Sequence, residues 1–98
     1  MTLTFTPDDF RPLLKKTFRV RGGHHVFTLT AVDAPDLGQP TPGARRSPFN
    51  LLFVGPPRDI LREGLYTLEA DDGRSFELYV IPIYTPARDR QDYQAPFN

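Results

Sequence analysis

Residues 65–80 read Leu-Tyr-Thr-Leu-Glu-Ala-Asp-Asp-Gly-Arg-Ser-Phe-Glu-Leu-Tyr-Val, and this stretch decides the fold. On both sides of Asp71-Asp72-Gly73, apolar and polar side chains alternate, as they do in a strand with one buried face. Aspartate and glycine favour tight turns, because aspartate bonds to nearby backbone amides and glycine readily adopts positive φ. The stretch therefore predicts a β-hairpin.

The length of the loop sets the register of this hairpin. A two-residue loop would place Leu68 opposite Glu77, which mixes apolar with polar side chains. A three-residue loop instead pairs Leu68 with Phe76, and it sorts apolar from polar along both strands. We therefore predict the three-residue loop, with Gly73 in the left-handed region as a bulge after a type I turn.

A second hairpin is predicted around Gly22-Gly23, since both glycines can adopt positive φ. A two-residue loop pairs Phe18 with Phe27, whereas a four-residue loop pairs Phe18 with Leu29. Both registers place Phe18, Val20, Phe27 and Leu29 on one face, so the buried face is predicted while the register stays open.

Two further segments complete the predicted strands. Residues 49–54 are apolar except for one asparagine, which is typical of a strand covered on both faces or deep in a small barrel. Tyr93, Ala95 and Phe97 alternate with other residues and predict a last edge strand. Pro96 favours an edge, because it cannot donate a hydrogen bond to a neighbouring strand.

The chain has 11 prolines, which favour short strands and shaped loops. Residues 6–16 begin with a threonine cap, a proline and two aspartates, and predict a short helix on the core. Residues 34–48 hold four prolines and two glycines and predict a long loop, and residues 59–63 allow one helical turn. Together these segments predict a mainly β fold over residues 1–98, a single small barrel or β-sandwich of about six short strands with one N-terminal helix or helical turn.

Length and composition exclude several classes of protein. The chain has 98 residues, which suits one domain. Twelve basic residues balance twelve acidic ones, so no net field draws the protein to nucleic acid or anionic membrane. The absence of cysteine excludes disulfides and thiolate catalysis. We also expect no membrane span and no signal peptide, because no apolar run approaches about 20 residues and residues 1–5 lack a basic start.

Catalytic chemistry is not predicted. Adjacent residues of a strand point to opposite faces, so His24 and His25 are interpreted as turn residues rather than a metal site. The turn explains Asp71-Asp72, and the helix start explains Asp8-Asp9. No nucleophile, base and orienting group can be assembled. We therefore expect no catalytic residues, no metal, no cofactor and no enzymatic activity.

Four residues are candidates for contact with a ligand or partner. Arg45 and Arg46 lie on the Pro/Gly-rich loop, where two guanidinium groups could grip a carboxylate or phosphate. A solvated loop or a local ion pair is the alternative. Tyr93 and Phe97 are interpreted as core residues of the last strand. Alternatively they form an exposed edge that a partner completes by strand addition.

Three segments, taken in order, resemble one family. They are residues 46–56 (Arg-Ser-Pro-Phe-Asn-Leu-Leu-Phe-Val-Gly-Pro), 64–66 (Gly-Leu-Tyr) and 93–98 (Tyr-Gln-Ala-Pro-Phe-Asn). They resemble the Arg-x-Pro-Phe-Ser-Leu-Leu-Phe-x-Gly-Pro, Gly-x-Tyr and Tyr-Glu-Ala-x-Phe-Asn segments of domain-of-unknown-function family 6916, a family of short bacterial proteins. Asn50 replaces the usual serine and Gln94 the usual glutamate, so a role for a carboxylate in the ending is not expected here.

The resemblance implies no catalytic residues, and it implies association with phage-tail-like or tail-collar proteins. We therefore expect a non-enzymatic structural or accessory interaction module that binds a protein partner or self-associates, without nucleic acid or membrane. It would act in the cytoplasm or assembled with a phage-tail-like particle. The alternative is a small β-barrel that binds an anionic or small ligand through its Pro/Gly/Arg loop.

Overall fold

The computed structural model describes residues 5–34 and 49–97 of the chain. A short helix, α1 (Pro7–Phe10), continues into a 3-10 turn, η1 (Arg11–Leu13). The strands that follow are β1 (Thr17–Val20), β2 (Val26–Asp33), β3 (Phe49–Gly55), β4 (Gly64–Ala70), β5 (Ser75–Pro82) and β6 (Gln91–Phe97). With four and three residues, the helical segments of the described chain are far too short to span a membrane.

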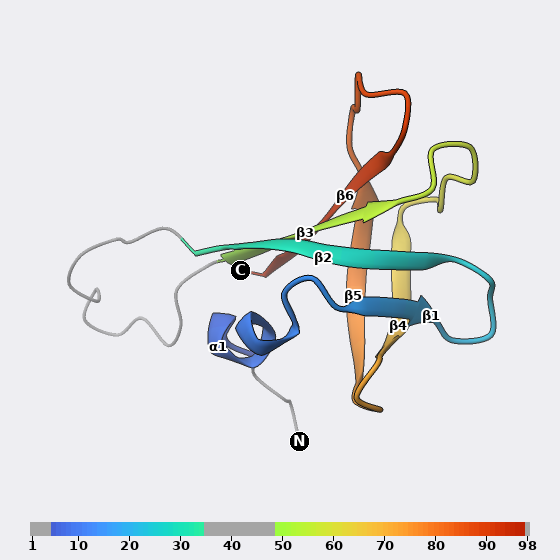
Figure 1. The fold of residues 1–98 in the computed structure, drawn as a ribbon. Coiled ribbons are helices and arrows are strands. Elements are labelled where there is room, and N and C mark those ends of the chain that lie inside the picture. Colours follow the sequence, from blue (N-terminus) through green and yellow to red (C-terminus); the bar gives the residue numbers. More distant parts are fainter. Residues whose placement is uncertain (1–4, 35–48, 98) are drawn as a thin grey trace.

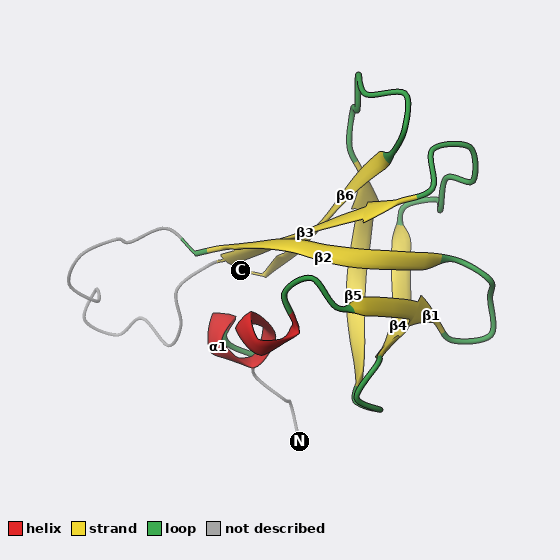
Figure 2. Ribbon diagram, viewed as in Figure 1, coloured by secondary structure: helices red, strands yellow, loops and turns green. Residues whose placement is uncertain are grey.

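The strands form one closed antiparallel barrel in the order β1-β2-β3-β6-β5-β4, with β4 pairing back to β1 (Figure 1). Figure 2 shows that strands make up most of the described chain and that helix occurs only before β1. The prediction of a mainly β fold with one short N-terminal helix is confirmed, and the architecture is a barrel rather than a sandwich.

The β4–β5 hairpin has the predicted register. Leu68 lies opposite Phe76, and Thr67 lies opposite Glu77. The turn is closed by a 3.0 Å hydrogen bond from the Gly73 N–H to the Ala70 carbonyl, and Gly73 has a φ of 91°. This is the expected three-residue loop with a left-handed glycine.

The β1–β2 hairpin has the register of the two-residue alternative. Phe18 lies opposite Phe27, and the Val20 N–H donates to the His25 carbonyl at 3.0 Å. Of the two glycines in the turn, only Gly22 adopts positive φ, 79°. The shared face is confirmed, since Phe18, Val20, Phe27 and Leu29 are all buried.

The barrel has two ends, which are named here by what covers them. The helix end lies under α1 and includes the β4–β5 turn. The loop end is formed by the β1–β2 turn (residues 21–25), the β3–β4 loop (56–63) and the β5–β6 connection (83–90). Between the two ends the interior is filled by fully buried side chains, the largest being Tyr93, Phe10, Phe18, Phe27, Phe53, Leu29, Leu51, Leu68, Leu78 and Val80.

An aromatic cluster closes the helix end. Phe10 of α1 is fully buried, with its ring centroid 4.9 Å from that of Phe76 and 5.6 Å from that of Phe97. Phe97 in turn stacks on Phe49 at 4.4 Å. The N-terminus of α1 is fixed by Asp9, whose carboxylate accepts the Thr6 N–H at 2.7 Å. The short helix therefore plugs the barrel instead of packing on its outer face.

The prediction that the last strand is an edge strand is wrong, because β6 lies between β3 and β5. Asp92 directs its backbone groups towards β5, where its carbonyl accepts the Ile83 N–H. Alternate residues share this direction, so Pro96 also faces β5. The paired stretch on that side ends at Gln94, opposite Ile81, so the missing N–H of Pro96 interrupts no hydrogen bond there.

The helical turn predicted at residues 59–63 is also wrong, since these residues form an irregular loop. Two tyrosine hydroxyls supply its hydrogen bonds instead. The Tyr93 hydroxyl accepts the Leu61 N–H at 2.9 Å, and the Tyr66 hydroxyl donates to the Arg62 carbonyl at 2.7 Å. Hydroxyl groups of barrel residues therefore bond the loop's backbone groups that hydrogen bonds within a helix would otherwise satisfy. The loop predicted at residues 34–48 lies almost wholly outside the described residues.

Candidate functional site

Arg45 and Arg46, the polar candidates from the sequence, lie outside the described residues. The anion-binding role proposed for them therefore stays a prediction. Among the described residues, the side chains that could bind a metal ion lie at the loop end of the barrel.

Tyr93 lies in the core, as the sequence interpretation favoured. Its side chain is fully buried, its ring packs 4.7 Å from that of Phe27, and its hydroxyl accepts the Leu61 N–H. Burial raises the pKa of Tyr93 above its ordinary value of 10.0, and the nearby Asp59 carboxylate adds to this rise. The hydrogen bond from Leu61 acts in the opposite direction on this pKa. Because its side chain is buried, Tyr93 does not contact a partner directly; it holds the β3–β4 loop in place through the hydrogen bond to Leu61.

Phe97 lies at the other end of the barrel. It is half-buried and packs against the aromatic cluster under α1, where its ring meets those of Phe10, Phe49 and Phe5. Tyr93 and Phe97 thus share the inner face of β6 but occupy opposite ends. They do not combine into one contact site.

The two histidines come together with a carboxylate at the loop end. The rings of His24 and His25 are stacked, with centroids 4.3 Å apart and planes 28° apart. Both face Asp59, which comes from the β3–β4 loop. The expectation that the two histidines point to opposite faces is wrong, because both belong to the turn after β1, where strand alternation does not apply.

The donor atoms of this cluster are close together. His24 Nε2 is in contact with Asp59 Oδ2, and His25 Nε2 lies 3.2 Å from Asp59 Oδ1. One donor atom from each of the three residues falls within 4.8 Å of the others. His25 is mostly enclosed, with 14% of its side chain exposed, whereas His24 is 75% exposed. These are the described residues that could hold a metal ion.

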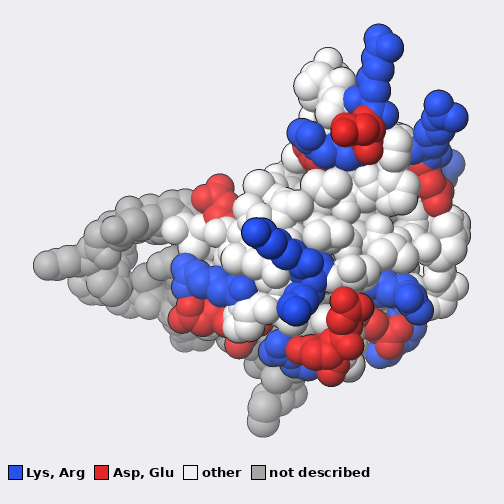
Figure 3. Space-filling model, viewed as in Figure 1, with Lys and Arg blue, Asp and Glu red and all other residues white. Residues whose placement is uncertain are grey.

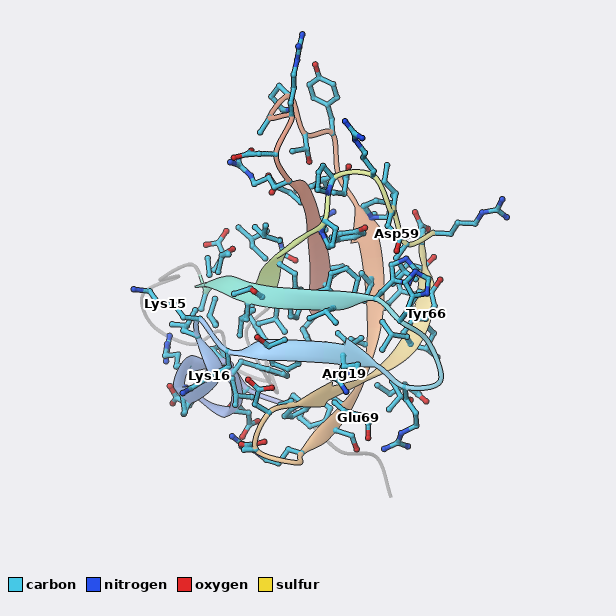
Figure 4. All side chains as sticks on the ribbon, turned by 45° about the vertical axis from the view of Figure 1, so that its right-hand side comes forward. Lys15, Lys16, Arg19, Asp59, Tyr66 and Glu69 are labelled. Atoms are coloured by element: carbon cyan, nitrogen blue, oxygen red, sulfur yellow. The ribbon has the colours of Figure 1, made fainter. Side chains whose placement is uncertain are left out.

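The cluster rests on the barrel wall. His25 lies over Phe27, with ring centroids 6.2 Å apart, and Phe27 packs against Tyr93. Gly55 leaves room for this arrangement, since a Cβ there would lie 2.8 Å from the Phe27 ring. Figure 4 shows Asp59 at the same end of the barrel as Tyr66, away from Lys15 and Lys16. A buried aromatic stack therefore supports the histidine side of the cluster.

The large apolar side chains that the described residues expose also lie towards the loop end. Leu65 at the start of β4 is 60% exposed, and it lies opposite Tyr79 of β5, which is 44% exposed. Ile60 in the β3–β4 loop and Tyr84 in the β5–β6 connection are 54% and 90% exposed. Val26 at the start of β2 is the fifth.

Sequence reasoning missed the cluster of His24, His25 and Asp59, and it did not single out the exposed apolar residues. Asp59 lies 35 residues after His24, so only the pairing of β2 with β3 shows that their loops meet. The one local signal was the Gly-Gly pair. It marks residues 22–25 as a turn, and in a turn His24 and His25 need not point to opposite faces. Leu65 and Tyr79 alternate with the buried residues of their strands, and this alternation is the signal that could have indicated that they face outward.

The fold and the loop end define a small closed antiparallel β-barrel plugged by a helix. The model of the family described as Domain of unknown function (DUF6916) matches residues 5–97. The chain therefore belongs to this family, as the resemblance implied. No curated protein and no solved structure matches the chain.

Proposed function

We propose that this domain is a non-catalytic interaction module that binds a protein partner at the loop end of its barrel. The observation that carries the proposal is the exposed apolar pair of Leu65 and Tyr79, which lie opposite each other on β4 and β5, with Ile60 and Tyr84 also exposed in the loops of this end. Exposed apolar side chains that gather in one region of a small domain are typical of interaction surfaces, and tyrosine is enriched there.

Leu65 and Tyr79 form the centre of the proposed surface. They are partners across β4 and β5, so their side chains adjoin on the outer face of the barrel. The Tyr79 hydroxyl donates to the Glu63 carboxylate at 2.5 Å, which holds the ring in place and raises the pKa of Tyr79. A ring fixed before binding loses little side-chain entropy on binding, so this pair suits a contact with a protein.

The closed barrel determines how a partner would bind. Each strand of the ring has a neighbouring strand on both sides, so we propose that the partner contacts side chains and loops rather than adding a strand. The interior is filled by side chains, which favours binding outside the barrel. Figure 3 shows Lys and Arg interspersed with Asp and Glu on the face in view, which favours a protein partner over a polyanion.

The family resemblance implies association with tail-collar proteins, and this suggests which kind of partner the domain binds. We propose a bacterial phage-tail-like or fibre assembly, with the domain free in the cytoplasm or bound to such a particle. This extension rests on an analogy of context rather than on the geometry of the site. Self-association through the same surface is the alternative outcome of the test.

Co-purification tests the proposal. The protein is expressed with the products of neighbouring genes, and its complexes are separated by size-exclusion chromatography. We expect a partner to co-elute with the wild type and to be lost from the Leu65→Ser/Tyr79→Ser double variant.

The matched control is the neighbouring outward pair on the same hairpin, changed as Thr67→Ser/Glu77→Ser, which should keep the partner. Circular dichroism establishes that both double variants stay folded. A wild-type protein that remains monomeric with no co-eluting partner contradicts the proposal, and so does equal binding by both double variants.

A further inference from the structure

We infer that His24, His25 and Asp59 form a binding site for a divalent transition-metal ion, with Zn²⁺ as the ion that suits them. The inference goes beyond the proposed partner binding and does not depend on it. It rests on the chemistry of the three donors, their spacing, an unpartnered nitrogen and the way the barrel holds them.

The donor set suits zinc. Imidazole nitrogens and carboxylate oxygens bind Zn²⁺ at about 2.0–2.2 Å, and open zinc sites have three protein ligands with water in the fourth position, whereas closed structural sites have four protein ligands. Two histidines and one carboxylate form such a set, whereas Ca²⁺ and Mg²⁺ prefer ligands that are all oxygen. With His24 75% exposed, water can reach the open position.

The spacing also fits. Two ligands about 2.1 Å from a tetrahedral zinc ion lie about 3.4 Å apart. His25 Nε2 and Asp59 Oδ1 are 3.2 Å apart, and the donor atoms of all three residues lie within 4.8 Å of one another. The proposal requires the exposed His24 side chain to rotate until its Nε2 occupies a coordination position around the ion.

One nitrogen in the cluster lacks a hydrogen-bond partner. His25 Nε2 is inaccessible to solvent, and it makes no hydrogen bond although Asp59 Oδ1 is 3.2 Å away. Proximity without hydrogen-bond alignment means that the ring nitrogen and the carboxylate do not satisfy each other directly. A cation held between them would satisfy both, and a bound ion is one of the recognised explanations for a buried polar atom without a partner.

The support beneath the cluster favours a defined site. The His25 ring is held over Phe27, and the Asp59 loop is tied to the barrel by the hydrogen bond from Leu61 to Tyr93. Ligands from two different loops would be joined by one ion. The metal would therefore act as a clip between the β1–β2 turn and the β3–β4 loop, next to exposed Ile60.

Calorimetry with ZnCl₂ on untagged, chelator-treated protein tests the inference. We expect one Zn²⁺ per chain, and an affinity lower by more than about 10-fold in His24→Gln, His25→Gln and Asp59→Asn, since even the loss of an outer partner of a ligand costs that much. Co²⁺ should give a visible absorption band in the wild type that each variant weakens. The control Glu77→Gln removes an exposed charge elsewhere and should bind Zn²⁺ like the wild type.

His24→Gln keeps the test decisive, because this exposed side chain can change without disturbing the core. Equal circular dichroism spectra of His24→Gln and the wild type exclude unfolding as the cause of lost binding. The inference is overturned if the wild type binds no Zn²⁺, or if His24→Gln and Asp59→Asn bind it as tightly as Glu77→Gln does. In that case the cluster is a hydrogen-bonded contact between histidine and aspartate.

Discussion

Tyr93 joins the interior of the barrel to the loop end through one side chain. Its ring fills the core beside Phe27, while its hydroxyl accepts the N–H of Leu61 in an irregular loop. Leu61 is itself buried, so water cannot easily replace this bond. The position of the Asp59 loop therefore depends on a hydroxyl supplied by the last strand.

We predict that Tyr93→Phe lowers the free energy of unfolding by about 1–3 kcal/mol, because the Leu61 N–H loses its buried partner. Denaturant unfolding measures the change. Tyr84→Phe removes a hydroxyl from a side chain that is 90% exposed, and should leave the stability unchanged. Equal stability of the two variants would contradict the structural role of the hydroxyl.

The same variant should alter the response to alkali. The raised pKa of Tyr93 means that the folded state holds this proton more tightly than the unfolded state. The stability is therefore fully present below the ordinary tyrosine pKa of 10.0 and falls as the pH rises above it. Tyr93→Phe should show a smaller fall, with Tyr79, whose pKa is also raised, accounting for part of the remainder.

Single residues also show where sequence reasoning reached its limit. Asn50 and Gln94 stand where the resemblance described above leads one to expect serine and glutamate, and their side chains meet, with Asn50 Nδ2 donating to Gln94 Oε1 at 3.2 Å. The two departures are thus one contact across β3 and β6. Nothing local to either residue reveals the other, because 44 residues separate them.

At the scale of elements, predictions held where the deciding interactions are local. The β4–β5 register follows from Gly73 and the alternation around it, and both lie within one hairpin. The place of β6 depends instead on whether the sheet closes, which is decided by pairs such as Phe49 with Phe97. The edge prediction failed because Pro96 is compatible with an interior strand when the neighbouring ladder stops short of it.

Close packing of one strand against another gives an element-scale prediction. Gly55→Ala should lower the free energy of unfolding by about 1–3 kcal/mol, because its Cβ would lie 2.8 Å from the Phe27 ring and overpack the barrel wall. Displacement of Phe27 should also disturb His25, which nuclear magnetic resonance of the imidazole protons would detect.

Gly23→Ala provides the control for this variant. A Cβ there meets Val20 at an ordinary distance of 3.5 Å, and the residue does not have positive φ. Its stability should stay within about 0.5 kcal/mol of the wild type. If Gly55→Ala lowered the free energy of unfolding as little as Gly23→Ala, the packing of Phe27 against Gly55 would be looser than the structure shows.

At the scale of the whole molecule, every strand contributes to one ring. β6 supplies buried Tyr93 and Ala95 to the interior and partners to both of its neighbours. The sequence predicted about six short strands but left their order in the sheet, and the choice between barrel and sandwich, open. Closure depends on the pairing of β1 with β4 and of β3 with β6, which no local pattern specifies.

Deleting residues 93–98 should abolish cooperative unfolding, since it removes most of the partners that β6 provides to β3 and opens the ring. Thermal melting followed by circular dichroism tests this. Pro96→Ala, which changes an exposed residue of the same strand, should melt like the wild type. An unchanged melting temperature in the deletion variant would instead mean that the ending is free for a partner.

The position of β6 also bears on how the protein is made. The β1–β2 and β4–β5 hairpins can form as soon as they are synthesised, but the ring cannot close until residues 91–97 have left the ribosome. Until then the apolar strand β3 lacks its partner on one side. Nascent chains with such a strand tend to aggregate, and late non-local pairing folds slowly. Chaperones that shield β3 during synthesis would therefore affect the yield of folded protein more than its final stability.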